Sequence, residues 1–348
     1  MASVISITKL RREIKHELYM KVKKAMELAK WQKHVKPGKI FIKPNYMSDQ
    51  VVPGQCTSPW VLEAVIKVVK EAMPYSKIIV GDADVATQRQ VEKSFKNWGI
   101  DRLCKELGVG LVNLSKQPTV KANIKGSIFK EMHIPKVIMN ADSIISVPVV
   151  KTHNVTKMSC ALKNQWGCIS RMRHRYHLVV DKCLADINSF LKIDFVVADA
   201  TICLEDNGPR VGKPRIMNAI LASSDRVALD CAVAKMMGID PAKVGHIVHA
   251  HKRGVGSMEY EIKGAKLPNE KFLPAKIEKH PIVYMEMLLR KVPVLNYILF
   301  NTPVFKIPAY IASKYNTLWW YNIKGKKYAR EIIKKSELYQ QEFEKLIK

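Results

Sequence analysis

Residues 147–177, VPVVKTHNVTKMSCALKNQWGCISRMRHRYH, are the most informative part of this chain. The apolar run 143–150 leads directly into them. From Lys151 to His177 the segment holds six basic residues and three histidines but no carboxylate. Open α/β folds build anion sites in this way, where a buried strand ends in cations and the chain continues as a loop and a helix. The segment therefore predicts an anion site at the end of a strand.

Short apolar strands and amphipathic helices alternate on both sides of this segment. Strands are predicted at 4–7, 39–45, 77–84, 109–114, 143–150, 194–199 and 218–223, with 127–134 as an added hairpin strand. Helices are predicted at 11–32, 90–107, 182–190 and 227–237, and after the hydroxyl cap and proline of Thr57-Ser58-Pro59. This rhythm predicts an α/β fold with a mostly parallel, doubly wound (Rossmann-like) sheet and helices on both faces.

The composition changes after Gly264, so we predict two parts. Residues 1–264 would form the α/β core, and residues 265–348 a basic, aromatic-rich helical extension. In the extension we expect short helices broken at Pro293, Pro303 and Pro308, followed by one amphipathic helix over 324–348.

An aromatic cluster and a cationic cluster are adjacent in this extension. Trp319, Trp320 and Tyr321 precede lysines at positions 324, 326 and 327. Such a pattern suits a membrane interface, or nucleic acid through stacking and phosphate contacts. A helical flap packed over the core is the third interpretation.

The chain is strongly basic. Its 348 residues carry a formal net charge of +27, which predicts attraction to nucleic acid, an anionic membrane surface or a phosphorylated or carboxylated substrate. A composition that simply favours lysine is the alternative, because the lysines are spread widely.

The cysteines and the hydropathy pattern indicate a cytoplasmic protein. Seven cysteines occur singly without a CxxC pair, so no iron–sulfur or zinc-ribbon motif is present, and an odd number fits a reducing compartment. The apolar run at the start is too short for a signal peptide. The longest apolar stretch, 282–300, is interrupted by charges and Pro293. Membrane association through the extension is the other localisation that we expect.

Polar residues stand at the ends of four predicted strands. They are Lys43 and Asn45, Asp82 and Asp84, Lys151 and His153, and Asp199 and Glu205. Because parallel strands end on the same edge of a sheet, we expect these side chains to meet in one crevice. Residues that only cap loops and helices are the alternative interpretation.

In such a crevice each residue type has an expected role. Lys43 and Lys151 would bind a carboxylate or phosphate, and Asn45 would orient it. His153 would be the acid–base group, with Asp82 or Asp199 as an orienting or metal-binding carboxylate.

Two further groups follow in the opening segment. Lys163 and Asn164 beside Gly167 suit close backbone approach to an anionic group, with Lys163 binding the anion and Asn164 orienting it. The neighbouring Cys160 and Cys168 match no common ligand spacing, so we expect buried structural thiols.

Residues 171–177, RMRHRYH, form the second group. His174 and His177 are three residues apart and would share a helix face. Arg171 and Arg173 are candidate anion ligands, and His177 is the alternate acid–base group. The cofactor stays unknown from the sequence; for a divalent metal the candidate ligands are Asp199, Glu205 and His174.

An ordered series of motifs resembles one family. KPN at 43–45, TSPWVLEAVI at 57–66, VGDAD at 80–84 and VPVVKTH at 147–153 are followed by ALKNQWG at 161–167, NGPRVG at 207–212 and LASSDRVALD at 221–230. The chain is similar over about residues 1–262 to the DUF362 family, which implies a Rossmann-like α/β core. Many members carry a ferredoxin-like segment with CxxCxxC motifs, which this chain lacks. A looser resemblance of organisation alone, to nickel-dependent lactate racemases, implies chemistry on a small acid.

The function that we expect from these residues is that of an enzyme or ligand-binding protein for a small anionic substrate. Binding of nucleic acid, with RNA as the candidate, through 171–177 and the extension is the second hypothesis. Peripheral membrane association through the extension is the third. The sequence predicts no oligomeric state.

Overall fold

The computed structural model describes residues 2–12, 14–85, 91–169, 171–276, 281–302, 304 and 306–346. Within these residues the main sheet has ten strands: β1 (Ser3–Lys9), β2 (Lys39–Pro44), β3 (Lys77–Asp82), β4 (Gly110–Asn113), β7 (Ser143–Val147), β8 (Val149–His153), β9 (Lys157–Ser159), β10 (Phe195–Glu205), β11 (Lys213–Ser223) and β12 (Tyr260–Gly264). A separate antiparallel pair consists of β5 (Thr119–Asn123) and β6 (Glu131–Pro135).

The main sheet is doubly wound around β2. Its strand order is β12-β1-β11-β10-β7-β2-β3-β4, and β8 pairs with β10 and β9 beside this path. Along the path each pairing is parallel except those of β11, which runs antiparallel to β1 and β10. The predicted fold class is confirmed. The strand order reverses between β2 and β7, the place where doubly wound sheets open a crevice beyond the carboxyl ends of the strands.

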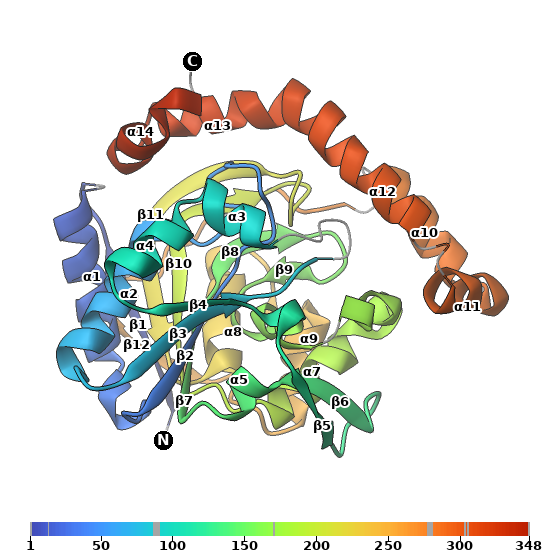
Figure 1. The fold of residues 1–348 in the computed structure, drawn as a ribbon. Helices are drawn as coiled ribbons and strands as arrows, with labels where there is room; N and C mark the ends of the chain where they lie inside the picture. Colours follow the sequence, from blue (N-terminus) through green and yellow to red (C-terminus); the bar gives the residue numbers. More distant parts are fainter. Residues whose placement is uncertain are drawn as a thin grey trace.

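Helices cover both faces of this sheet (Figure 1). They are α1 (Lys15–Leu28), α2 (Pro59–Ala72), α3 (Val91–Asn97), α4 (Ile100–Glu106), α5 (Lys136–Met139), α6 (Ala161–Asn164), α7 (Val180–Phe190), α8 (Arg226–Met236) and α9 (Gly245–Lys252). Side chains of each strand alternate between two apolar clusters, as period-2 geometry requires. In β10, Val196 and Ala198 join the cluster with α7 to α9, whereas Phe195 and Val197 join the cluster with α1 and α2.

The two helices predicted at 11–32 and 90–107 differ from their predicted bounds. Helix α1 begins at Lys15 because the Glu17 carboxylate accepts the backbone N–H groups of Arg11 (2.7 Å) and Arg12 (2.9 Å), which holds those residues ahead of the helix. The helix predicted at 90–107 is divided into α3 and α4 by Gly99, whose φ of +71° interrupts right-handed helix. Residue 90 lies outside the described residues.

The predicted hydroxyl cap of α2 is wrong. Proline does occupy the first helical turn, but the Ser58 side chain makes no capping hydrogen bond. Instead the Ser58 backbone N–H donates to Asp199 Oδ2 at 2.7 Å.

Two strands also differ from their predicted bounds. The strand predicted at 143–150 is divided into β7 and β8 at Pro148, which has no N–H for the ladder. The added strand starts only at Glu131, because the Asp186 carboxylate accepts the backbone N–H groups of residues 127–129.

The C-terminal helices form an arc along one side of the core (Figure 1). They are α10 (Pro281–Arg290), α11 (Pro293–Asn301), α12 (Lys306–Lys314), the π-helix η8 (Tyr315–Gly325), α13 (Lys326–Ile333) and α14 (Glu337–Phe343). The breaks predicted here are only partly right. A helix begins at Pro293, but Pro308 lies in the first turn of α12, where a missing N–H has no cost. Residue 303 lies outside the described residues.

The single helix predicted at 324–348 is wrong. Helical structure runs without interruption over 306–333, and α14 restarts after Ser336, whose side chain accepts the Tyr339 N–H. The last turns pack into the core, with the ring centroids of Trp60 and Tyr339 4.8 Å apart. Within the described residues, no helix is long and apolar enough to span a bilayer.

Candidate functional site

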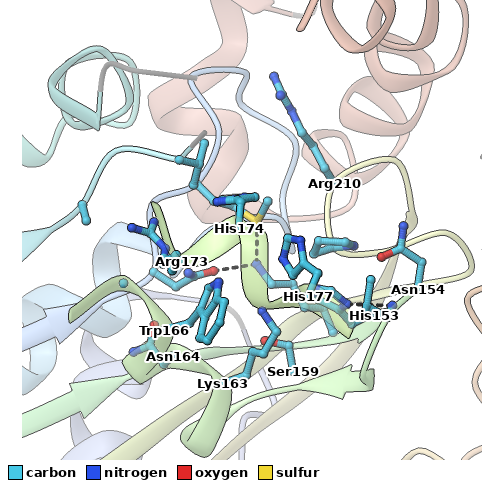
Figure 2. A pocket seen from close by; sticks show the side chains of 18 of the residues that line it. His153, Asn154, Ser159, Lys163, Asn164, Trp166, Arg173, His174, His177 and Arg210 are labelled. Atoms are coloured by element: carbon cyan, nitrogen blue, oxygen red, sulfur yellow. Dashed lines mark hydrogen bonds between the residues drawn. The ribbon is translucent and has the colours of Figure 1, made fainter. Parts of the chain in front are cut away.

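A cavity of about 240 Å³ lies at the carboxyl ends of β2, β3 and β8. Figure 2 shows its polar side chains gathered around Lys163, His153 and His177. Ten of the residues predicted for a site line it: Lys43, Asn45, Asp82, Lys151, His153, Lys163, Asn164, Arg173, His174 and His177. Five of the eight polar strand-end residues thus lie together, from β2, β3 and β8, whereas Asp84, Asp199 and Glu205 do not line the cavity. Lys163 and Asn164 join them from α6, and Arg173, His174 and His177 join them from the 3₁₀ helix η4 (Arg171–Val179).

Lys43 and Asp82 form a buried ion pair at the floor of this cavity. Lys43 Nζ lies 2.6 Å from Asp82 Oδ1 and also donates to the Pro44 carbonyl and to Asn164 Oδ1. Asp82 in turn accepts the backbone N–H groups of Tyr46 and Ala83. The donors of Lys43 are thus occupied by protein acceptors.

Gly167 allows this ion pair to be covered closely. A Cβ at Gly167 would lie 2.9 Å from Asp82 Oδ1 and 3.1 Å from Lys43 Nζ. Because glycine has no Cβ, the backbone at position 167 can pack directly against the Lys43–Asp82 ion pair.

Lys151 is also held by the protein. Its Nζ donates to Asn45 Oδ1 (2.5 Å) and the Gln55 carbonyl (2.8 Å), and it lies 3.2 Å from Met47 Sδ. Burial lowers the pKa of Lys151 to about 8. Asn45 and Asn164, predicted to orient a ligand, hold the two strand-end lysines in this structure.

Lys163 differs from both of these lysines. It is 8% exposed and lines the cavity, yet no hydrogen-bond acceptor for its Nζ is found among the described residues. The Nζ atom lies 5.7 Å from the centre of the Trp166 ring, within cation–π range. Burial, followed by repulsion from Lys151 and Arg173, lowers the pKa of Lys163 to about 7. Near neutral pH this residue holds or releases a proton at little cost.

His153 has a defined tautomer. Its Nδ1 lies 3.1 Å from the Val155 N–H and 3.4 Å from the Thr156 N–H, so Nδ1 accepts and the proton is on Nε2. Burial, with the charges of Lys163 and Lys151, lowers the pKa of His153 well below its usual value. His153 is therefore a neutral ring that offers an N–H donor from Nε2. The acid–base role expected for it stays a prediction.

His174 and His177 lie together, as their spacing predicted. Their ring centroids are 4.7 Å apart, and the His177 ring stacks on Trp166 at 6.0 Å. Burial and the neighbouring His174 lower the pKa of His177 well below its usual value. This places two neutral rings, His153 and His177, beside Lys163.

The arginines of 171–177 do not form a single exposed face. Arg173 is buried and donates to the carbonyl oxygens of Ile169 and Asp84, whereas Arg175 is exposed and contacts the Tyr176 hydroxyl. The side chain of Arg171 lies outside the described part of the structure. Arg173 therefore lines the cavity with its guanidinium group held by two backbone carbonyl oxygens.

Arg210 is a cavity residue that the sequence analysis missed. It is 6% exposed, and none of its three guanidinium nitrogens has a hydrogen-bond partner among the described residues; Asp49 Oδ1 lies 3.9 Å from Nη2. Burial lowers its pKa to about 10. The sequence feature that could have identified Arg210 is the NGPRVG motif at 207–212. This motif lies in the glycine- and proline-rich loop between β10 and β11.

The metal ligands considered from the sequence are not brought together. Asp199 accepts from the Ser58 N–H and from Thr201, Glu205 pairs with Arg215, and His174 lies in the cavity without either of them. Across the described ranges, no group of three or more metal-ligating side chains was found. The seven cysteines are buried and unpaired, which confirms the prediction for Cys160 and Cys168.

This chain is similar to a curated protein and to several solved structures. A thylakoid-associated protein of Synechocystis sp. is 27% identical over 239 residues, which cover 66% of this chain and 72% of the relative. The lactate racemase apoprotein from Thermoanaerobacterium thermosaccharolyticum has a TM-score of 0.46 at 11% identity, covering 68% of this chain and 57% of that one. A Thermotoga maritima protein has a TM-score of 0.39 at 13% identity, covering 57% and 53%.

The aligned regions thus span little more than half the length of those two structures. The strongest family evidence comes from the sequence. A family model described as a domain of unknown function, DUF362, matches residues 40–235, which is more than half of the chain and includes all of the polar strand-end residues described above. This chain therefore belongs to the DUF362 family.

Proposed function

We propose that the cavity binds a small anionic ligand, a carboxylate or a phosphate, and acts on it by proton transfer. The observation that supports this most directly is Lys163, a buried ammonium group that lines the cavity and for which the described residues provide no hydrogen-bond acceptor. A buried charge of this kind is costly unless it is paired. A ligand anion would supply the missing partner.

The charge of the cavity lining supports the same ligand class. Five basic side chains line it, namely Lys43, Lys151, Lys163, Arg173 and Arg210, against the single carboxylate of Asp82. That carboxylate is already paired with Lys43. The remaining cations lie in a desolvated space, where attraction to an anion is much stronger than in water.

The neighbouring groups suggest how the bound anion would be handled. Lys163, with a pKa of about 7, would donate and accept the proton. The Nε2–H of His153 would stabilise an oxygen on which negative charge develops. His177 and Trp166 would restrict water on one side of the reacting group.

Binding can be tested by thermal denaturation in the presence of inorganic phosphate and a panel of small carboxylates. A ligand at about a hundred times its Kd stabilises a protein by about 2.7 kcal/mol. We expect at least one anion to raise the Tm of the wild type and to have little effect on Lys163→Met.

The matched control is Lys192→Met, a lysine whose side chain is 84% exposed. This variant should respond to the anion as the wild type does. If no anion in the panel stabilises the wild type, or if Lys163→Met responds fully, the proposed ligand class is wrong.

A further inference from the structure

The exposed apolar side chains are concentrated in the C-terminal helices. Of the 23 large hydrophobic side chains that are exposed in the described residues, 16 lie between Tyr284 and Ile323. Large exposed apolar patches on soluble proteins usually mark a binding surface. Helices α10, α11, α12 and η8 carry this surface, which lies outside the region matched by the family model.

The helical run through α12 and η8 is apolar on two opposite sides. Its inner side buries Ala309 and Trp320 against the rest of the protein. Its outer side exposes Ile307 (62%), Tyr310 (63%) and Leu318 (59%). Each apolar side of a helix is stabilised by an apolar neighbour. The protein supplies only the inner one among the described residues.

The charge of the C-terminal helices indicates which kind of partner would cover the outer side of α12 and η8. Residues 281–335 contain ten basic and two acidic residues, while α11 (PVLNYILFN) contains none of either kind. Lys291, Lys314 and Lys324 are exposed beside the apolar groups. Apolar and aromatic side chains interspersed with lysines suit the interface of an anionic bilayer.

We propose that α10, α11, α12 and η8 form a docking surface for an anionic lipid bilayer. The helices would lie in the plane of the interface, with the apolar side chains below the headgroups and the lysines at the lipid phosphates. A second copy of the chain is a poorer occupant, because it would bring two strongly basic surfaces together. This proposal does not depend on the anion pocket for its support.

The docking surface and the cavity share structural elements. Met287, Pro308, Ala309 and Ala312 line the cavity from the C-terminal helices. Arg290 of α10 donates to the His174 carbonyl, which ties the same helices to η4. The helices that would contact lipid on one side therefore form a wall of the pocket on the other.

The test is flotation of the full chain with vesicles of equal parts phosphatidylglycerol and phosphatidylcholine. The wild type should float with these vesicles and bind much less to pure phosphatidylcholine. The triple variant Val294→Glu, Ile307→Glu, Leu318→Glu should lower the bound fraction roughly tenfold or more. The control triple variant, Tyr75→Glu, Met139→Glu, Ile262→Glu, changes apolar side chains that are exposed on the surface of the α/β part of the protein. It should bind like the wild type.

A second readout does not require charged variants. Brominated lipids should quench tryptophan fluorescence of the wild type, and Trp319→Phe should remove most of that quenching because Trp319 is half-exposed on the docking surface. The proposal is overturned if the wild type stays unbound or the docking triple binds like the wild type. It is also overturned if light scattering shows a wild-type dimer that this triple converts to monomer. Lys163→Met should still bind vesicles, which separates this result from failure of the anion pocket.

Discussion

At the scale of single residues, the site is defined by what surrounds each lysine. Lys43, Lys151 and Lys163 are all buried. Lys43 and Lys151 donate to protein acceptors, whereas the part of the chain that the structure describes holds no acceptor for Lys163. A buried charge with a good partner stabilises the fold, whereas one without a partner costs free energy. Lys43 and Lys151 therefore stabilise the fold, whereas Lys163 lowers its stability. From the sequence alone, all three lysines have the same predicted anion-binding role.

Replacement of two of these lysines should show this difference. Lys43→Met would leave the Asp82 carboxylate buried and unpaired, so the free energy of unfolding should fall by about 3–5 kcal/mol. Lys163→Met removes a buried charge that has no acceptor, so it should leave stability unchanged or raise it. Urea denaturation of the two variants measures both effects. Equal destabilisation by the two changes would contradict the assignment of Lys163 as the unpaired group.

The pH dependence provides an independent check on Lys163. Its pKa is lowered to about 7 in the folded state from a usual value of 10.5, so the unfolded chain binds more protons between these limits. The free energy of unfolding should therefore rise with pH from about 7 to about 9, and more steeply in the wild type than in Lys163→Met. Anion affinity should change in the opposite direction, because Lys163 loses its charge over the same range. Urea melts and calorimetric titrations with the stabilising anion, at a series of pH values, measure the two trends.

At the scale of secondary-structure elements, side-chain carboxylates determine where several helices and loops begin. Glu17 holds the residues before α1, Asp186 holds the loop before β6, and Asp230 accepts the N–H groups of Ala161 and Leu162 at the start of α6. The last of these contacts fixes the short helix that carries Lys163. Hydrophobic periodicity locates the elements, but these carboxylates decide their ends.

Asp225 offers the clearest test at this scale. Its carboxylate accepts from the N–H groups of Val227, Ala228 and Ser257 and from the Ser3 hydroxyl. Asp225→Ala should lower the free energy of unfolding by about 2–4 kcal/mol, because it removes a helix cap and two links to other segments. Asp240→Ala, which removes one N–H contact at an exposed turn, should cost about 1 kcal/mol or less. Similar losses in the two variants would contradict this account.

At the scale of the whole molecule, the C-terminal residues are part of the core. Phe272 packs in one apolar cluster, and Trp320, Ile333 and Tyr339 pack in the other. The boundary predicted at residue 264 stays a prediction. The packing shows that the two predicted parts share buried surface.

Truncation after Gly264 should therefore damage the fold. Each buried aromatic side chain that is lost costs about 3–5 kcal/mol, against a total stability of about 5–15 kcal/mol for a typical domain. We expect the truncated chain to aggregate or to melt far below the full chain in a thermal scan. A truncated chain with an unchanged Tm would show that the core folds independently of residues 265–348.

The local sequence determined the strands, most of the helices and the polar residues at the strand ends. Period-2 and period-3.6 patterns set the fold class, and parallel geometry requires that Lys43, Asp82 and Lys151 meet at one edge. Only the tertiary structure decided which cavity lysines are paired by the protein and that Lys163 has no hydrogen-bond acceptor among the described residues. Hydrogen-bond partners such as Asn45 and Gln55 for Lys151 come from segments about a hundred residues away. The same holds for Arg210, because its burial depends on chain packing around a loop that no local pattern describes.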